Sequence, residues 1–183
     1  MKQIEIKMTR ELKEYSFENG RYVDLKQLEA GFVEESIFRQ IHPNSAIACH
    51  DVFINYQGGI LLVTRDNVPA KGILWPIGGR IERGVPIEKS LRRKTKKECG
   101  LILTDLEYID SARHFWETDP FGHGKGTDSP VFVYFAKGEG ELRLDNFHKE
   151  PRIVKRGDYT EEFRQSLYPY VRDFMDICIP KIK

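Results

Sequence analysis

The sequence predicts an α/β fold in which a mixed β-sheet lies between helices, with helical additions at both ends of the chain. Apolar residues fill segments 46–56 and 60–65, which a short glycine turn separates, and this arrangement predicts a β-hairpin. A charged segment between Pro86 and Gly100 is bounded by residues that commonly begin and end helices. Further apolar runs follow it, and strands on both sides of one embedded helix are typical of a sheet covered by helices.

The first 45 residues predict an arm followed by a helix. Asp24 can cap that helix, and apolar side chains follow at near-helical spacing: Leu25, Leu28, Phe32, Val33, Ile37 and Phe38. Pro43 ends the periodicity. We therefore expect an N-terminal arm and helix over residues 1–45, a main domain over 46–158, and a C-terminal helix packed on that domain over 159–183.

The remaining elements follow from local composition. We expect a short strand at 73–77, a helix from about 86 to 98, strands at about 106–116 and 131–137, and shorter extended pieces at 141–144 and 151–155. A glycine- and charge-rich loop at 117–130 separates the longer strands and is expected to be a flexible cover over the substrate. The tail, from about 160 to 177, has helical periodicity, and Pro169 should kink or split that helix.

The composition argues against a membrane protein, against a protein that binds nucleic acid through its overall charge, and against a disulfide-rich protein. Of 183 residues, 40% are hydrophobic and 31% are charged, as is usual in soluble globular proteins. The formal net charge is +1, so no global field favours nucleic acid or a membrane surface. We find neither an apolar leader segment nor a run of about 18 apolar residues, and we expect a cytoplasmic protein without a membrane span. Cys49, Cys99 and Cys178 form no C-x-x-C pair, so we expect three reduced thiols.

One face of the central helix carries an unusual set of charges. Side chains at i, i+3 and i+4 share a helix face, and three glutamates at this spacing converge on hard cations. Lys94, Lys97 and Glu98 take these positions here, so two positive charges stand beside one negative charge. Such a face can hold at most one Mg²⁺ ion, weakly in the absence of ligand.

The segment around this helix resembles the box of the Nudix hydrolase superfamily, G-x5-E-x7-R-E-U-x-E-E-x-G-U, where U is aliphatic. The matching residues are Gly79, Arg93, Glu98, Gly100 and Leu101, and the departures are Val85, Lys94, Thr95 and Lys97.

Several motifs in the same order resemble the GDP-mannose mannosyl hydrolase branch: Arg65, Asn67-Val68-Pro69-Ala70-Lys71-Gly72, Gly78-Gly79-Arg80, Arg93-Lys94-Thr95-Lys96-Lys97-Glu98-Cys99-Gly100, His114-Phe115-Trp116 and Gly126-Thr127-Asp128. The likeness covers about residues 45–150 and implies a Nudix-type α/β/α sandwich. In that fold we expect Lys94, Lys97 and Glu98 to face the cleft, with Glu98 as an exposed carboxylate. Arg92 and Lys96 are expected to point outwards.

The resemblance implies hydrolysis of a nucleoside-diphosphate sugar such as GDP-mannose, assisted by one Mg²⁺ ion. Glu98 and the Gly78 carbonyl would bind the ion together with the diphosphate. Arg65 and Arg80 would clamp phosphate oxygens during catalysis. His148 would act as the general base for a water that attacks the anomeric carbon of the sugar. Further candidates for binding the substrate are Asp51, His114, Lys94 and Lys97.

Two functional classes stay open. An enzyme needs Glu98 and an arginine clamp around one cation, although Phe147 stands where the family has a metal-binding glutamine. A Nudix-fold binding module would instead use Lys94 and Lys97 as phosphate counter-ions in place of metal, without hydrolysis. The basic run 92–97 is otherwise explained as a solvated helix face or a small nucleic-acid patch, and Glu98 as a structural partner of Lys94. The expected partner is a small nucleotide or nucleotide sugar rather than nucleic acid, and a homodimer stays open.

Overall fold

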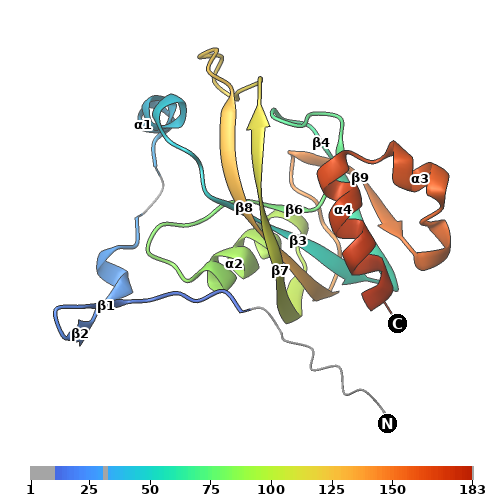
Figure 1. Cartoon of the computed structure of the whole chain (residues 1–183), viewed down its shortest axis with the longest axis horizontal. Coiled ribbons are helices and arrows are strands. Elements are labelled where there is room, and N and C mark those ends of the chain that lie inside the picture. Colours follow the sequence, from blue (N-terminus) through green and yellow to red (C-terminus); the bar gives the residue numbers. More distant parts are fainter. Residues whose placement is uncertain (1–10, 31–32, 183) are drawn as a thin grey trace, which may run out of the picture.

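The computed structural model describes residues 11–30 and 33–182 and confirms the predicted α/β fold, with a mixed sheet between helices (Figure 1). In the described residues the main sheet has seven strands: β3 Cys49–Tyr56, β4 Gly59–Arg65, β5 Leu74–Trp75, β6 Ile77–Arg80, β7 Ile102–Trp116, β8 Thr127–Glu139 and β9 His148–Val154. Their order is β5-β4-β3-β8-β7, with β6 also paired to β3 and β9 to β4. The β3–β8 pair is parallel and the other pairs are antiparallel, which makes the sheet mixed.

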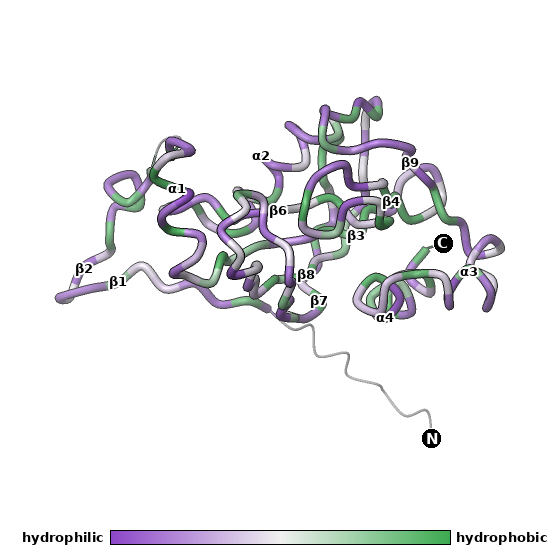
Figure 2. Tube along the Cα trace, turned by 90° about the horizontal axis from the view of Figure 1, so that it is seen from above, coloured by the Kyte–Doolittle hydropathy of each residue, from purple (hydrophilic) through white to green (hydrophobic). Residues whose placement is uncertain are grey.

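The helices cover both faces of this sheet. They are α1 Glu35–Ile41, α2 Ile87–Cys99, α3 Glu161–Ser166 and α4 Pro169–Cys178, with 3₁₀ turns at Leu25–Gln27, His42–Asn44, Arg156–Asp158 and Ile179–Lys181. A separate small hairpin consists of β1 Phe17–Glu18 and β2 Arg21–Tyr22. The view from above shows α2 and α4 on opposite sides of the sheet (Figure 2). None of the helices in the described ranges is long and apolar enough to cross a membrane.

The two layers of hydrophobic core follow from the alternation of side chains along β3. Val52 and Ile54 belong to the cluster that includes Leu91 of α2, whereas Phe53 belongs to the cluster that includes Phe174 of α4. Successive side chains of a strand point to opposite faces of its sheet, so β3 contributes to both cores. Val52, Phe53 and Ile54 are fully buried, as expected for a strand covered on both faces.

Local signals place the hairpin and α2 where the sequence predicts them. Gln57 and Gly58 have positive φ angles of 50° and 78° and form the tight turn between β3 and β4. α2 begins after Pro86 and ends at Gly100, whose φ of 76° is the left-handed conformation found after many helices. The positions of the hairpin turn and of the two ends of α2 are therefore set by a few neighbouring residues.

Pro169 splits the tail helix, as predicted. α3 begins after Thr160, whose hydroxyl accepts a hydrogen bond from the Phe163 amide. α4 then begins with Pro169 in its first turn, where the missing N–H would have no helical partner. The buried side of α4, including Val171 and Met175, packs against the sheet, so the tail completes the second core.

The single helix expected after Asp24 is wrong. Asp24 caps only the 3₁₀ turn Leu25–Gln27. The Ala30 amide then donates to the Arg83 carbonyl at 3.3 Å, so a contact with the loop before α2 replaces a helical hydrogen bond. Gly31 and Phe32, which the expected helix included, lie outside the described residues.

The extended piece expected at 141–144 is not a strand. The Arg143 amide donates to the Cys99 carbonyl at 2.9 Å, and the Asp145 amide donates to the Glu98 carbonyl at 2.8 Å. The last carbonyls of a helix lack helical partners, so this segment satisfies the end of α2 instead of joining the sheet. These hydrogen bonds also hold the segment that precedes β9 against the end of α2.

Candidate active site

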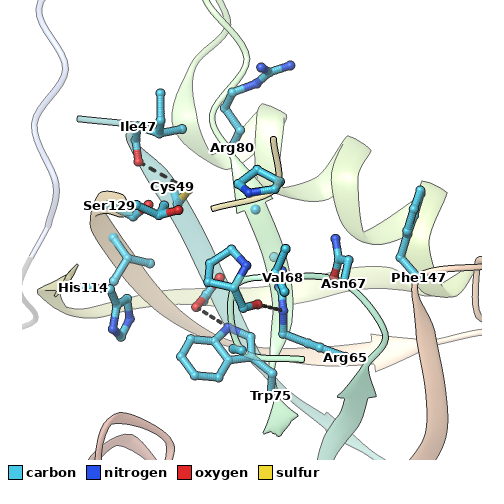
Figure 3. A pocket seen from close by; sticks show the side chains of 18 of the residues that line it. Ile47, Cys49, Arg65, Asn67, Val68, Trp75, Arg80, His114, Ser129 and Phe147 are labelled. Carbon is cyan, nitrogen blue, oxygen red and sulfur yellow. Dashed lines mark hydrogen bonds between the residues drawn. The ribbon is translucent and has the colours of Figure 1, made fainter. Parts of the chain in front are cut away.

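One cleft, with a volume of about 390 Å³, brings together all of the site residues predicted from the sequence. They are Asp51, Arg65, Gly78, Arg80, Lys94, Lys97, Glu98, His114 and His148. Figure 3 shows part of the lining of the cleft and labels Arg65, Arg80 and His114 among these residues. The strands β3, β4, β6, β7 and β9 and the helix α2 supply them. The sheet and its first helical layer are therefore both needed to assemble the cleft.

The charged face of α2 is oriented as predicted. Lys94, Lys97 and Glu98 line the cleft, whereas the Arg92 and Lys96 side chains donate to backbone carbonyls away from it. The expectation that Glu98 is exposed is wrong, because only 7% of its surface is accessible. The segment that precedes β9 packs against this end of the helix through backbone hydrogen bonds. Lys94 Nζ lies 3.2 Å from Glu98 Oε1.

Burial and a neighbouring ammonium act in opposite directions on the Glu98 carboxyl group. Its Oε2 atom is buried and has no hydrogen-bond partner among the described residues. Burial raises the pKa of Glu98, while the ammonium of Lys94 acts in the opposite direction. This carboxylate therefore has one oxygen at a cation and one oxygen without a partner.

His148 is buried and oriented by a residue that the sequence did not single out. Its Nδ1 atom lies 2.7 Å from Asp145 Oδ1. A carboxylate can only accept, so Nδ1 is the donor, and Nε2 of the neutral ring is free to accept a proton. His148 also pairs with Arg65 across β4 and β9. The spacing of Asp145 three residues before His148 is the sequence signal that could have indicated this pair.

The two predicted phosphate clamps differ in their surroundings. Arg65 is largely buried and its Nε atom donates to the Pro69 carbonyl at 3.1 Å. Burial lowers the pKa of Arg65, while Asp51 acts in the opposite direction. Arg80 is exposed, and its guanidinium carbon lies 4.1 Å above the ring of Phe38 in α1. Arg65 lies beside Trp75, and Arg80 lies towards the other end of the cleft (Figure 3).

Aromatic residues surround the buried carboxylate of Asp51. Its Oδ2 atom accepts hydrogen bonds from Trp75 Nε1 at 3.1 Å and from the Tyr170 hydroxyl at 2.9 Å. Burial raises the pKa of Asp51 to about 6. Trp75 and Trp116 pack in the core and also line the cleft, with ring centroids 5.8 Å apart.

His114 lies within the same aromatic group. Its ring centroid is 5.3 Å from that of Trp75 and 4.4 Å from that of Tyr170. Its Nε2 atom is buried without a hydrogen-bond partner in the described part of the chain. Burial lowers the pKa of His114 to about 4, so the ring is neutral near pH about 7 and adds no charge to this end of the cleft.

The rim of the cleft includes two segments that the sequence did not connect. Phe38 of α1 and Phe121 of the loop between β7 and β8 both line the cleft, with ring centroids 5.5 Å apart. Nearby, His42 Nδ1 lies 2.7 Å from His123 Nε2. These contacts join segments about eighty residues apart, which no local pattern reports.

The cleft offers few side-chain donors to a metal ion. Among residues 11–30 and 33–182, no group of three or more His, Cys, Asp or Glu side chains is arranged to hold a metal ion. The unpartnered Oε2 of Glu98 and the backbone carbonyl of Gly78, which lines the same cleft, are oxygen donors of the kind that Mg²⁺ prefers. An ion held there would take most of its oxygens from ligand and water.

Comparisons with known proteins agree with this architecture. The low-salt glycan biosynthesis protein Agl8 of Haloferax volcanii is 24% identical over 148 residues, which cover 79% of this chain and 89% of Agl8. An ADP-ribose pyrophosphatase of Methanocaldococcus jannaschii is 34% identical over 110 residues, which cover 60% of each chain. The structure of a MutT NUDIX hydrolase from Burkholderia pseudomallei superposes with a TM-score of 0.55 at 21% identity, covering 73% of this chain and 98% of that one, and so shares its fold.

The sequence also matches the model of the NUDIX domain over residues 46–174. This range includes every strand of the main sheet, α2, and the residues that line the cleft from those elements. Because the match spans well over half of the chain and the fold agrees with it, the chain belongs to the Nudix hydrolase superfamily.

Proposed function

We propose that the protein hydrolyses a nucleoside-diphosphate sugar, GDP-mannose or a close relative, to a free sugar and a nucleoside diphosphate. The observation that carries this proposal is the pairing, in one cleft, of cationic side chains with an aromatic group around a buried carboxylate. Cations suit a diphosphate, whereas aromatic rings with a fixed hydrogen-bond acceptor suit a sugar.

Four cations along the cleft are the proposed phosphate contacts. Arg65, Arg80, Lys94 and Lys97 all line the cleft. The planar guanidinium groups would bind phosphate oxygens in pairs, and the lysines would add point charges. Nudix hydrolases generally use a divalent metal such as Mg²⁺. One such ion at Glu98 and Gly78 would neutralise charge on the departing diphosphate.

The sugar end of the proposed site is formed by Asp51, His114, Trp75 and Trp116. The hydrogen bonds from Trp75 and Tyr170 fix the Asp51 carboxyl group, so it is ready to accept from a sugar hydroxyl without reorganisation. Agl8 is named for glycan biosynthesis, which supports a sugar-containing substrate.

His148 is the proposed general base. With Nδ1 donating to Asp145, Nε2 would take a proton from water as the water oxygen bonds to the anomeric carbon of the sugar. The bond from that carbon to the phosphate oxygen breaks, and the diphosphate leaves with the electron pair. Arg65, beside His148 in the sheet, would stabilise the negative charge that develops.

A catalytically silent binding module is the second candidate, and the ion pair between Lys94 and Glu98 favours it. A lysine at the predicted metal carboxylate can serve as a phosphate counter-ion without any hydrolysis. The two candidates differ in turnover, which a single assay measures.

The test is hydrolysis of GDP-mannose and other nucleotide sugars that are linked through the anomeric carbon, with Mg²⁺ in ¹⁸O-labelled water. ADP-ribose, whose terminal ribose is linked through C5, is included as a substrate that tests for attack on phosphorus. We expect the label in the free sugar and none in the nucleoside diphosphate, by mass spectrometry. His148→Asn should lower turnover by roughly 10²–10⁴-fold. The matched control is Lys96→Met, outside the cleft, which should leave turnover unchanged.

Two outcomes would contradict the proposal. Label in a nucleoside monophosphate or a sugar phosphate would place the attack on phosphorus and assign a pyrophosphatase reaction. Absence of turnover on every nucleotide sugar, together with tight binding of diphosphates, would leave the binding module as the function.

A further inference from the structure

The ammonium of Lys94 lies beside Glu98, one of the two groups proposed to bind metal. Its Nζ atom is 3.2 Å from Glu98 Oε1. The same side chain lies over Gly79, where an added Cβ atom would come within 2.9 Å of Lys94 Cε and 3.3 Å of Nζ. Gly79 adjoins Gly78, the other candidate ligand. The Lys94 side chain therefore lies between α2 and β6, in contact with Glu98 and over the glycine that follows Gly78.

Glu98 and Lys94 differ in their freedom to move. The Glu98 side chain is 10% exposed and its only ion pair within the described residues is with Lys94, whose own side chain is 31% exposed. A buried carboxylate without a counter-charge is unfavourable, so the ammonium stabilises it. Lys94 has a flexible four-carbon stem and can move its charge without any change in the helix, whereas Glu98 cannot leave its buried position.

A divalent cation would compete with this ammonium. Two positive charges at the same carboxylate repel each other, most strongly where water is largely excluded. A diphosphate in the cleft changes this balance, because its oxygens offer the ammonium an alternative partner. Metal binding and ligand binding are then coupled, and the coupling works in both directions.

We propose that Lys94 is an exchangeable stand-in for the metal ion. It neutralises Glu98 when the cleft is empty and moves to a phosphate oxygen when a diphosphate arrives with a divalent cation. This inference rests on the proposed function only in that it assumes a diphosphate ligand and a cation at Glu98. Lys94 thereby makes metal binding conditional on the ligand.

Lys97 provides a matched control on the same helix face. It lines the cleft three residues further along α2, and it makes no ion pair with any residue in the described ranges. Its removal takes one positive charge from the cleft and leaves the contact between Lys94 and Glu98 in place. Any effect specific to Lys94 must then come from that contact.

The experiment measures two affinities of the full chain, for Mn²⁺ without nucleotide and for GDP in EDTA. Lys94→Met should bind Mn²⁺ at least tenfold more tightly than the wild type and GDP at least fivefold more weakly. Lys97→Met should weaken GDP binding but leave Mn²⁺ binding unchanged. Lys94→Gln, which keeps a hydrogen-bond donor but no charge, should resemble Lys94→Met and is the second variant if the first does not fold. Circular dichroism checks the fold.

A folded Lys94→Met or Lys94→Gln variant that binds Mn²⁺ no more tightly than the wild type would overturn the proposal. Equal gains in Mn²⁺ affinity for the Lys94 and Lys97 variants would also overturn it, because a general charge effect would then explain both. Both affinities are measured without turnover. A protein that binds GDP and hydrolyses no nucleotide sugar would refute the proposed function and leave this inference intact.

Discussion

The charged side chains of the cleft differ in how firmly the fold holds them. Asp51 accepts hydrogen bonds from Trp75 and Tyr170 and is 4% exposed, whereas Arg80 is exposed and rests on one aromatic ring. A change at a buried, bonded residue alters stability as well as binding, whereas a change at an exposed residue mainly alters binding. Stability therefore has to be measured with activity for each buried position.

His114 should make the stability of the protein depend on pH. Burial lowers its pKa from the usual 6.5 to about 4, so between these values the unfolded chain binds a proton that the folded protein does not. Stability is unaffected above this window and is lost as the pH falls through it. His114→Phe removes that proton and should reduce the slope by about 1.4 kcal/mol per pH unit.

Urea denaturation across the window measures this slope. His50, whose pKa is also lowered to about 4 by burial, remains in the variant and should retain part of the pH dependence. A slope identical to that of the wild type would show that His114 does not titrate differently in the two states.

At the scale of elements, α1 contributes to the cleft although it lies before the matched Nudix region. Phe38 packs against Phe121 and supports the Arg80 guanidinium. The loop that carries Phe121 also receives a hydrogen bond from Arg39, to the Phe121 carbonyl at 3.3 Å. The N-terminal helix therefore positions one of the proposed phosphate clamps.

Phe38→Leu should weaken GDP binding about two- to fivefold, the effect of losing one exposed cation–π contact of about 0.5–1 kcal/mol. Titration calorimetry measures the affinity. The control is Ile37→Ala on the same helix, because Ile37 is 50% exposed and outside the cleft. Equal affinities for Phe38→Leu and the wild type would remove α1 from the binding site.

Elements with local signals were predictable from the sequence. Pro86 and Gly100 marked α2 to within one residue, and Pro169 marked the break in the tail. The helix expected from Asp24 failed because a hydrogen bond between Ala30 and the distant Arg83 carbonyl competes with helical pairing. Local propensity gives no information on such a contact.

In the candidate site, too, some features could be predicted from local sequence and others depend on distant contacts. The set of residues in the cleft followed from motif positions, but their environments did not. Glu98 was expected to be exposed, and its burial depends on backbone hydrogen bonds from Arg143 and Asp145 that form only when the chain folds. The orientation of His148 by Asp145 depends on the same docked segment.

At the scale of the whole molecule, Asp51 connects the central sheet to the C-terminal helix. It lies in β3, and its carboxyl group accepts from Trp75 in β5 and from Tyr170 in α4. The hydroxyl of Tyr170 crosses from the tail helix to a residue 119 positions earlier in the chain. The C-terminal helix therefore supports the cleft as well as the core.

Tyr170→Phe should lower the free energy of unfolding by roughly 1–3 kcal/mol, because a buried carboxyl group loses one of its two donors. Urea denaturation measures the change. Tyr168→Phe is the control, since the Tyr168 ring stacks on Trp116 and its hydroxyl does not bind Asp51. Equal stability of the two variants would mean that the hydrogen bond contributes nothing measurable.

The two backbone hydrogen bonds at the end of α2 also bear on how this scaffold can change over evolutionary time. Asp145 links Glu98 and His148, because its amide donates to the Glu98 carbonyl and its carboxylate accepts from the His148 ring. The positions of Glu98 and His148 are therefore coupled, and the two residues with Asp145 form one unit. The rim formed by α1 and the loop between β7 and β8 lies outside that unit. Insertions or substitutions in the rim can alter which molecules enter while the spacing of the two proposed reactive groups stays constant. We therefore expect new specificities to be accessible from this chain without any change in the groups proposed to carry out its chemistry.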